Sequence, residues 1–327
     1  MPLRETTFRE AINEALREEM RRDGSVLVMG EDVGYSGGVR LVTKGLFEEF
    51  GCERVRDTPL AEPGFVGAAV GAALTGMRPV VEVMYSDFFA TCFDEIFDLA
   101  AKWRYTHGGQ MKVPLTVRCC YGSFGSGGSM HSQAQYDTIF MHCPGLRVIV
   151  PSTPYDAKGL MKTAIRSNNA SIFFEHRLLY PIRGVVPEEE YTIPLGVADI
   201  KREGNDVTVV ATGIMVQKSM EAAEQVHKEG VSVEVIDPRT LSPLDRQTIV
   251  RSVRKTGKLV TVEEGTKTAG TGAEIASIVV EEAFDHLDAP IKRVAARDVP
   301  IPYSPPLEAF VIPDRDSIIK AIKEVVA

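Results

Sequence analysis

The sequence has few cysteines, and their positions exclude the common structural uses of this residue. They are odd in number, show no C-x-x-C spacing and include one adjacent pair: Cys52, Cys92, Cys119, Cys120 and Cys143. A disulfide framework needs paired cysteines in a short secreted chain, and a structural zinc site needs closely spaced pairs of ligands. We therefore expect neither, and we expect free thiols in a reducing compartment, the cytoplasm by default.

Long basic runs and long apolar runs are also missing. Asp and Glu (45) outnumber Lys and Arg (37), so the formal charge is −8, and no cluster of basic residues stands out. Binding of nucleic acid or of an anionic membrane surface is therefore not expected. Acidic residues interrupt each apolar stretch of residues 1–16, so we expect neither a signal peptide nor a transit peptide there.

The common nucleotide and zinc-protease motifs are absent as well. The sequence contains no G-x-x-x-x-G-K-[ST] and no H-E-x-x-H. Its nearest dinucleotide-binding pattern begins at Gly270-Thr271-Gly272, but Ile275 takes the place of the third glycine, and a long loop separates the pattern from the preceding strand. A nucleotide site at this place is not expected.

Strand-like and helical patterns are present and alternate along the whole chain. A length of 327 residues predicts about two domains. Alternating strands and helices predict an α/β fold with a parallel sheet in each domain. The segment PIRGVVPEEEYTIP at 181–194, with three prolines and an acidic triplet, has the composition of a linker. We predict a first domain at 1–180, a linker at 181–198 and a smaller second domain at 199–327.

Two patterns near the N-terminus predict a helix and a ligand-facing loop. Apolar residues recur with helical spacing from Phe8 to Met20, with Thr7 as the N-cap and Gly24 as the stop. The short apolar run SVLVMG then ends in the glycine-rich polar segment GEDVGYSGG, which is typical of the carboxyl end of a parallel strand. Further along, residues 88–105 predict one helix.

Glu62 has two interpretations that the spacing alone leaves equally open. It follows the strand-like RVRD and Thr58-Pro59, directly before Pro63 opens a helix. In the first interpretation it is a first-turn acid that complements the helix dipole. In the second, its setting between Leu60 and an Ala/Gly-rich helix places the carboxyl in a poorly solvated crevice, where it exchanges a proton with a bound ring nitrogen.

His131 and Phe88 are weaker candidates. His131 follows the glycine-rich stretch GSFGSGGSM, so it can approach a substrate as acid, base or oxyanion partner. The simpler interpretation, a surface imidazole bonded to backbone, is the more frequent one for such a residue. Phe88 offers an aromatic face to a flat ligand, although most aromatic residues at such spacing belong to the core.

Taken together, the motifs resemble one family along nearly the whole chain. They are GEDVG at 30–34, TKGL at 43–46, RVRDTPLAE at 54–62, GAAVGAALTGMRPVVE at 67–82, HSQ at 131–133, HCPGLRV at 142–148, PSTPYDAKGL at 151–160, AIRSNN at 164–169, IDPRTLSPLD at 236–245 and TGAEI at 271–275. The chain resembles the β subunit of two-subunit thiamine-diphosphate-dependent E1 enzymes, namely pyruvate, branched-chain 2-oxo acid and acetoin dehydrogenases. So many ordered motifs make the resemblance specific.

The resemblance implies a pyrimidine-binding domain followed by a transketolase-type C-terminal domain. It implies that Glu62 contacts N1′ of the cofactor's aminopyrimidine, and that Leu60 and Phe88 are apolar contacts of its rings. It also implies that His131 assists acyl transfer to the lipoyl group. A potassium ion held mainly by backbone oxygens is implied at Leu115, Ala164, Ile165, Ser167 and Asn169, although Ser167 stands where several relatives have aspartate.

The resemblance also implies partners. The family's magnesium site, usually GDG followed by a helix and an asparagine, is absent from this sequence. An α subunit is therefore expected to supply Mg²⁺ and the diphosphate end in an α2β2 heterotetramer, with a lipoyl-bearing E2 as acceptor. The expected substrate is pyruvate, a related 2-oxo acid or acetoin, with branched-chain acids less favoured.

Two alternatives stay open, and so does the detail of the substrate. The first alternative is a split transketolase-like ketol transferase, and the second is a non-catalytic assembly subunit. The stretch from the HSQ at 131–133 to the PGL at 144–146 is one residue longer than usual, and it lies where substrate and lipoyl arm are expected to meet.

Overall fold

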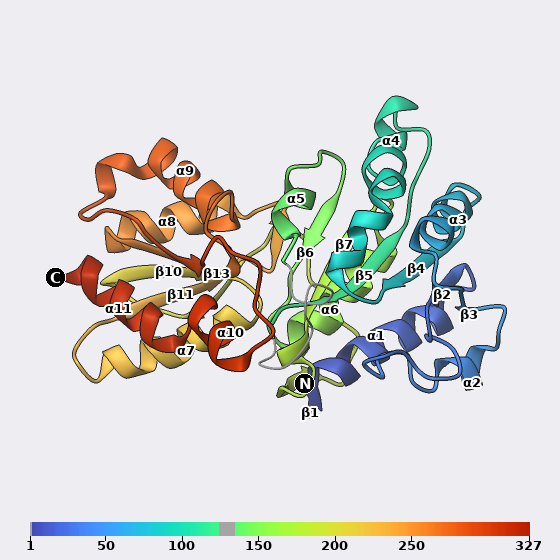
Figure 1. Cartoon of the computed structure of the whole chain (residues 1–327), viewed down its shortest axis with the longest axis horizontal. Helices are drawn as coiled ribbons and strands as arrows, with labels where there is room; N and C mark the ends of the chain where they lie inside the picture. The colour runs from blue at the N-terminus through green and yellow to red at the C-terminus, as the bar shows by residue number, and fades with distance from the viewer. Residues whose placement is uncertain (1, 124–134) are drawn as a thin grey trace. The chain divides into compact units, whose positions relative to one another are not determined.

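The computed structural model describes residues 2–123 and 135–327 (Figure 1). The chain divides into two compact units. The N-terminal unit comprises residues 1–121 and 139–195, and the C-terminal unit comprises residues 122–138 and 196–327. No helix in the described parts of the chain is long and apolar enough to cross a membrane.

The N-terminal unit is built around a parallel sheet with strand order β6-β7-β5-β4-β2-β3. Helices α1 and α6 pack together on one face, and α3 lies against β4 (Figure 1). Its strands are β1 (Leu3–Thr7), β2 (Val26–Gly30), β3 (Val55–Asp57), β4 (Arg78–Val83), β5 (Thr116–Tyr121), β6 (Arg147–Ile149), β7 (Ser171–His176) and β8 (Arg183–Pro187). Its α-helices are α1 (Phe8–Arg22), α2 (Leu46–Phe50), α3 (Glu62–Leu74), α4 (Trp103–Thr106) and α6 (Pro154–Arg166), while α5 (Asp137–Met141) contributes its last residues.

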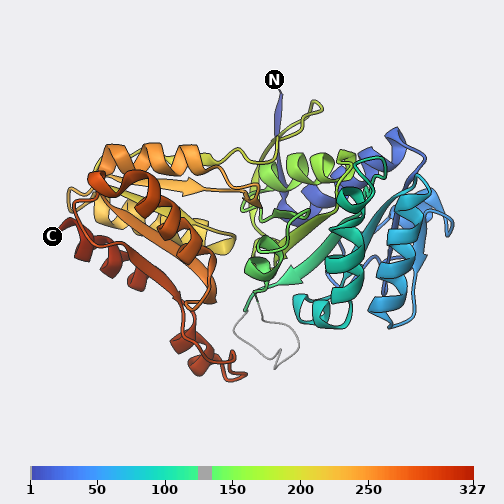
Figure 2. The ribbon, with the colours of Figure 1, turned by 90° about the horizontal axis from the view of Figure 1, so that it is seen from above.

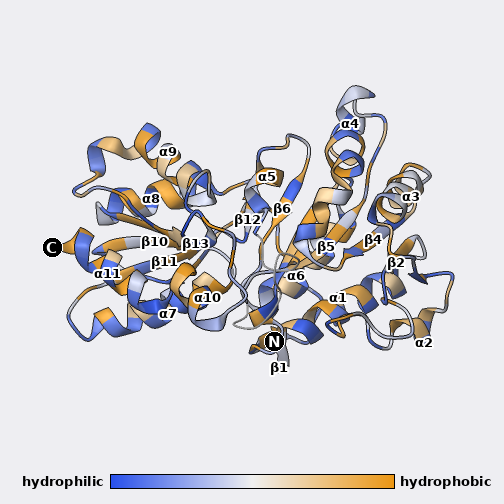
Figure 3. Ribbon diagram, in the orientation of Figure 1, coloured by the Kyte–Doolittle hydropathy of each residue, from blue (hydrophilic) through white to orange (hydrophobic). Residues whose placement is uncertain are grey.

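The helix predicted from Phe8 to Met20 is confirmed as α1. Thr7 caps it through a reciprocal pair of hydrogen bonds with Glu10, and its buried residues follow the predicted spacing. The ribbon of α1 carries hydrophobic and hydrophilic residues in turn, as expected of an amphipathic helix (Figure 3). Its inner face packs against α6, with ion pairs from Glu18 to the buried Lys158 and Lys162.

The prediction of one continuous helix over 88–105 is wrong. Instead, a 3-10 helix at Ser86–Thr91, a π-helical turn at Glu95–Ala100 and the short α4 follow one another. The widened turn bonds the N–H of Ala101 to the carbonyl of Ile96. Gly145 packs so closely against the Ala101 carbonyl that a Cβ there would lie 2.1 Å from its oxygen. This tertiary contact is not encoded in the local apolar spacing.

The segment 181–198, predicted as a linker, contains a strand. β8 pairs with β1 in antiparallel register and forms a two-stranded ribbon with it. Pro181 precedes this strand and Pro187 ends it, as expected for proline in an edge strand. The N-terminal unit extends to Leu195. The domain limits of 1–180 and 199–327 remain predictions.

The C-terminal unit is a second, separate α/β layer structure. Its sheet has the order β14-β13-β10-β11-β9 and is parallel except for β9, which pairs with β11 in antiparallel register. Helices α8 and α9 cover one face, and α7 and α11 cover the other (Figures 1 and 2). The elements are β9 (Asp199–Arg202), β10 (Val207–Ala211), β11 (Val233–Asp237), β12 (Thr240–Ser242), β13 (Leu259–Thr266), β14 (Lys292–Ala296), α7 (Ile214–His227), α8 (Arg246–Thr256), α9 (Thr271–Ala283), α10 (Pro305–Val311) and α11 (Arg315–Val326).

All five cysteines are free thiols in the structure. Four of them are buried and Cys52 is exposed. In addition, no group of three His, Cys, Asp or Glu side chains within residues 2–123 and 135–327 is arranged to hold a metal ion.

Candidate active site

The candidate site lies at the carboxyl edge of the N-terminal sheet. Strands β3, β2 and β4 are parallel neighbours there, so the loops that follow them emerge on the same side. Glu31 comes directly after β2, Glu62 comes five residues after β3, and Phe88 follows β4. Side chains that are far apart in the sequence are thereby brought to one edge of the sheet.

Glu62 is a buried acid at the start of a helix. It is the first residue of α3 and only 6% exposed, and the N-cap residue Ala61 provides no side-chain cap. The partial positive charge of the helix N-terminus offsets part of the cost of burying this carboxylate. The position of Glu62 is therefore compatible with both interpretations, a first-turn acid and a carboxyl in a poorly solvated crevice. Burial, however, distinguishes Glu62 from an ordinary solvated first-turn acid.

Glu31 is a site residue that the sequence analysis did not single out. It is 7% exposed, and its Oε1 has no hydrogen-bond partner within the described residues. Burial raises the pKa of its carboxyl, and the negative charge of Glu62 adds to this rise. Two neighbouring buried carboxyls, one with an unpaired oxygen, suit a ligand that brings hydrogen-bond donors. The available signal was the position of Glu31 in GEDVG, directly after a strand.

The loop that carries Glu31 is fixed to the end of β3. The backbone N–H of Gly34 donates a hydrogen bond of 2.6 Å to the Asp57 carboxylate. A Cβ at Gly34 would lie 2.6 Å from Asp57 Oδ2, so a larger residue here would displace the Asp57 carboxylate from this position. The glycine of the motif thus keeps two loops of the site together.

Leu60 and Phe88 supply apolar groups at the same edge. Leu60 is 79% exposed on the loop before α3. Phe88 is half-buried, with its ring against that of Tyr85 at a centroid distance of 5.9 Å. The buried thiol of Cys92 donates a hydrogen bond to the Phe88 carbonyl at 3.8 Å. Burial raises the pKa of Cys92 to about 12, and Glu95 and Glu62 add to this rise, so it remains a neutral thiol.

His131 lies outside the residues that the structure describes. Its predicted role therefore stays a prediction.

The residues predicted to hold potassium gather at the C-terminal end of α6, where helix carbonyls concentrate partial negative charge. They are Ala164 and Ile165 in its last turn, Ser167 at its C-cap, Asn169 beyond it and Leu115 before β5. Arg78 already donates to the carbonyls of Ile165 and Ser167, each at 3.0 Å. These carbonyl oxygens favour a positive charge, and the Arg78 guanidinium supplies one at the oxygens of Ile165 and Ser167. Potassium at this place remains a prediction.

At Gly270–Gly272, the start of α9 binds an acidic side chain of the same chain. The Glu263 carboxylate accepts hydrogen bonds from the backbone N–H groups of Thr271 (2.7 Å) and Gly272 (2.9 Å). A Cβ at Gly270 would lie 2.5 Å from Glu263 Oε2. The glycines therefore admit a carboxylate of the same chain.

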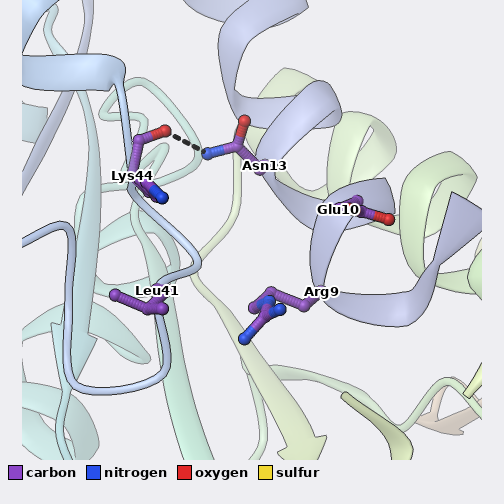
Figure 4. A pocket seen from close by; sticks show the side chains of 5 residues that line it. All are labelled: Arg9, Glu10, Asn13, Leu41 and Lys44. Atoms are coloured by element: carbon purple, nitrogen blue, oxygen red, sulfur yellow. Dashed lines mark hydrogen bonds between the residues drawn. The ribbon is translucent and has the colours of Figure 1, made fainter. Parts of the chain in front are cut away.

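A separate surface pocket of about 230 Å³ lies between α1 and the loop at 41–44 (Figure 4). Its lining residues are Arg9, Glu10, Asn13, Leu41 and Lys44. The Asn13 amide donates to the Lys44 carbonyl at 3.0 Å, and Glu10 caps α1. None of the predicted site residues that the structure describes lines this pocket.

Comparison with known proteins matches both units. The family description "Transketolase, pyrimidine binding domain" matches residues 4–183, and "Transketolase, C-terminal domain" matches residues 196–318. A solved chain titled "Split gene transketolase, inactive beta4 tetramer" superposes with a TM-score of 0.81 at 25% identity, covering 98% of each chain.

Curated relatives are similar over almost the whole length. The acetoin:2,6-dichlorophenolindophenol oxidoreductase subunit beta of Bacillus subtilis is 47% identical over 96% of this chain and 95% of its own. The pyruvate dehydrogenase E1 component subunit beta of Rickettsia felis is 48% identical over 98% of each. The 2-oxoisovalerate dehydrogenase subunit beta of Bacillus subtilis is 45% identical over 97% of this chain and 98% of its own. The chain therefore belongs to the family of transketolase-type, thiamine-diphosphate-dependent E1 β subunits.

Proposed function

We propose that this chain is the β half of an E1 enzyme that decarboxylates pyruvate or a related 2-oxo acid, or cleaves acetoin, and transfers the acyl group to lipoamide on an E2 partner. The observation that carries the proposal is the pair of neighbouring buried carboxyls, Glu62 and Glu31, at the edge of the pyrimidine-binding sheet. Relatives named for acetoin, pyruvate and 2-oxoisovalerate are 45–48% identical, which supports this shared substrate class.

The residues at this edge fit an aminopyrimidine. Thiamine diphosphate, when bound, would supply a carbon nucleophile, formed by loss of a ring proton, and a ring that delocalises the negative charge of C–C cleavage. Glu62 would hold or donate the proton at N1′ of the ring. The Oε1 of Glu31, which has no hydrogen-bond partner within the described residues, would accept a hydrogen bond from a donor on the ring. Leu60 and Phe88 would cover the rings and exclude water.

An α subunit completes the site in this proposal. It would bind the diphosphate and Mg²⁺, since the sequence has no GDG motif, and the assembly would be an α2β2 heterotetramer. The subunit names of the relatives support a partner chain. A cytoplasmic location, supported by the free thiols, and a potassium ion beside α6 also belong to the proposal.

The alternatives are less well supported. The split transketolase is 25% identical, against 45–48% for the E1 relatives. A non-catalytic assembly subunit would not need buried carboxyls at the sheet edge, because burying an acid is costly unless it is paired or functional.

The isolated chain is expected to bind the cofactor poorly. Without an α subunit, the groups that hold Mg²⁺ and the diphosphate are absent, so Mg²⁺-dependent affinity for thiamine diphosphate should be far below that of the complex. Titration calorimetry on the chain alone and on the α-plus-β complex measures the difference. The solved β4 tetramer of the split transketolase, described as inactive, is consistent with this expectation. Equal affinity in both preparations would contradict a split site.

His131→Ala should slow acyl transfer to lipoamide and leave cofactor affinity nearly unchanged. The predicted role of His131 is on the substrate side, so the loss should appear with lipoamide and be smaller with an artificial electron acceptor. Comparing kcat with the two acceptors separates the steps. A fall in cofactor affinity as large as the fall in turnover would place His131 elsewhere.

A further inference from the structure

The surface pocket between α1 and the loop at 41–44 lies within the N-terminal unit, and neither Glu31 nor Glu62 lines it (Figure 4). Its volume of about 230 Å³ is smaller than the roughly 300–1,000 Å³ of pockets that enclose larger ligands. The pocket is therefore suited to a small molecule or to one charged group of a larger one.

Two of the lining side chains, Asn13 and Glu10, are already engaged by the protein. The Asn13 amide donates to the carbonyls of Val42 at 2.6 Å and Lys44 at 3.0 Å, which uses both of its hydrogens. The Glu10 carboxylate accepts the N–H (2.9 Å) and the hydroxyl (2.7 Å) of Thr7, and Figure 4 shows its side chain pointing away from the loop. These two residues therefore form walls of the pocket.

Arg9 and Lys44 bring two positive charges to the same pocket. Arg9 extends from α1 toward the loop, where its guanidinium donates one hydrogen bond, to the Arg40 carbonyl at 3.5 Å (Figure 4). Within residues 2–123 and 135–327, neither Arg9 nor Lys44 forms an ion pair with a carboxylate, whereas Arg17, two turns further along α1, pairs with Glu49. A guanidinium has five N–H donors and an ammonium has three, so most of these donors can bind a ligand.

We propose that this pocket binds a phosphate group through the Arg9 guanidinium and the Lys44 ammonium. A phosphate group carries about −1.5 to −2 charges at pH 7, which matches two cations, and a guanidinium can bind two of its oxygens at once. Leu41, which also lines the pocket and is 43% exposed, offers an apolar contact to a small organic group attached to the phosphate. The proposal goes beyond the proposed function and does not depend on it.

A ligand in this pocket would contact the loop that carries Glu31. Thr43 lies in the pocket's loop, and its buried hydroxyl donates to the Val33 carbonyl at 2.7 Å. In the same loop, the N–H of Gly38 donates to the carbonyl of Asp32, the residue after Glu31, at 2.7 Å. Because these bonds hold the loop together, binding at its outer end should slow its opening.

Titration calorimetry with inorganic phosphate, on the α-plus-β complex saturated with thiamine diphosphate, tests the site. We expect saturable binding in the wild type and an affinity lower by about tenfold or more in Arg9→Gln and in Lys44→Gln, since each loses a charged hydrogen bond. Arg21→Gln is the matched control, because Arg21 is an exposed residue of α1 that pairs with Glu49 and does not line the pocket. Absence of saturable binding, or equal affinity in all four proteins, would overturn the proposal.

Two further anions test the charge and the source of the ligand. Acetate carries one charge and should bind about tenfold more weakly than phosphate, since it satisfies only one cation. Acetate binding as tight as phosphate binding would overturn the match to two cations. Ethyl phosphate distinguishes the sources: tighter binding than that of inorganic phosphate would support a phosphorylated metabolite as the ligand, and equal or weaker binding would support free phosphate.

Hydrogen–deuterium exchange gives a readout that does not depend on turnover. At about ten times Kd, phosphate should slow exchange at amides 38–43 about tenfold in the wild type and in Arg21→Gln. It should leave exchange unchanged in Lys44→Gln at the same concentration. The Lys44 side chain is exposed and only its backbone carbonyl accepts the bond from Asn13, so this variant should keep the fold of the loop. Unchanged exchange in the wild type, or equal slowing in Lys44→Gln, would overturn the assignment of the site.

Discussion

Glu62→Gln in the complex with the α subunit should lower kcat by roughly 10²–10⁴, with a smaller change in cofactor affinity. The substitution keeps the size and shape of the side chain and removes the acid. A carboxyl can accept or share the proton that a ring nitrogen exchanges, whereas the amide offers only a fixed donor and a weak acceptor. Because Glu62 is buried beside a second carboxyl, solvent does not readily replace it.

The direct measurement is hydrogen–deuterium exchange at C2 of the bound cofactor, followed by acid quench and NMR. Glu274→Gln is the matched control, because Glu274 is an exposed first-turn acid of α9. Loss of a helix-dipole contact alone costs about 0.3–1 kcal/mol of stability and should affect both variants alike. Exchange as fast as in the wild type would reduce Glu62 to a first-turn acid.

The same variant should change the ionisation of Glu31. The charge of Glu62 contributes to the raised pKa of Glu31, so replacing it with a neutral amide should lower that pKa toward its ordinary value. Carboxyl NMR of Glu31 in the wild type and in Glu62→Gln reports this change. It measures the contact between the two carboxyls independently of turnover.

Arg118→Met should destabilise the N-terminal unit by about 3–5 kcal/mol. Arg118 of β5 is fully buried and donates to Glu175 at 2.6 and 2.8 Å and to Glu82 at 2.7 Å. Both carboxylates raise the pKa of Arg118 against the opposing effect of burial, so it stays charged. Methionine fills much of the same volume but leaves two carboxylates buried without their cation.

Denaturant unfolding of the wild type and of Arg118→Met over a pH series measures the loss in the free energy of unfolding. The pKa of Glu175 is raised by burial even beside Arg118, so without the cation it takes up a proton more readily. A group with a raised folded pKa stabilises the fold below its unfolded pKa of about 4.3, and this contribution is lost as the pH rises. The loss in Arg118→Met should therefore be larger at pH 8 than at about pH 5. Arg118→Met combined with Glu175→Gln should recover part of it, and a loss independent of pH and of Glu175 would contradict the ionic explanation.

The sequence by itself determined the local elements and the identity of several site residues. Thr7 and Glu10 lie three residues apart, so the cap of α1 could be read directly from the chain. Glu62 stands immediately before a proline that opens a helix, so its place at the start of α3 could also be predicted from neighbouring residues in the sequence. Motifs spread over nearly all 327 residues also sufficed to indicate the family.

Only the tertiary structure decided which of these residues meet. Glu31 and Glu62 follow two different strands, β2 and β3, and the pairing of these strands brings their carboxyls close together. Arg78 reaches the carbonyls of Ile165 and Ser167 from almost 90 positions earlier in the chain. Contacts at such separation depend on sheet register and helix packing, and side-chain periodicity within one element carries no information about them.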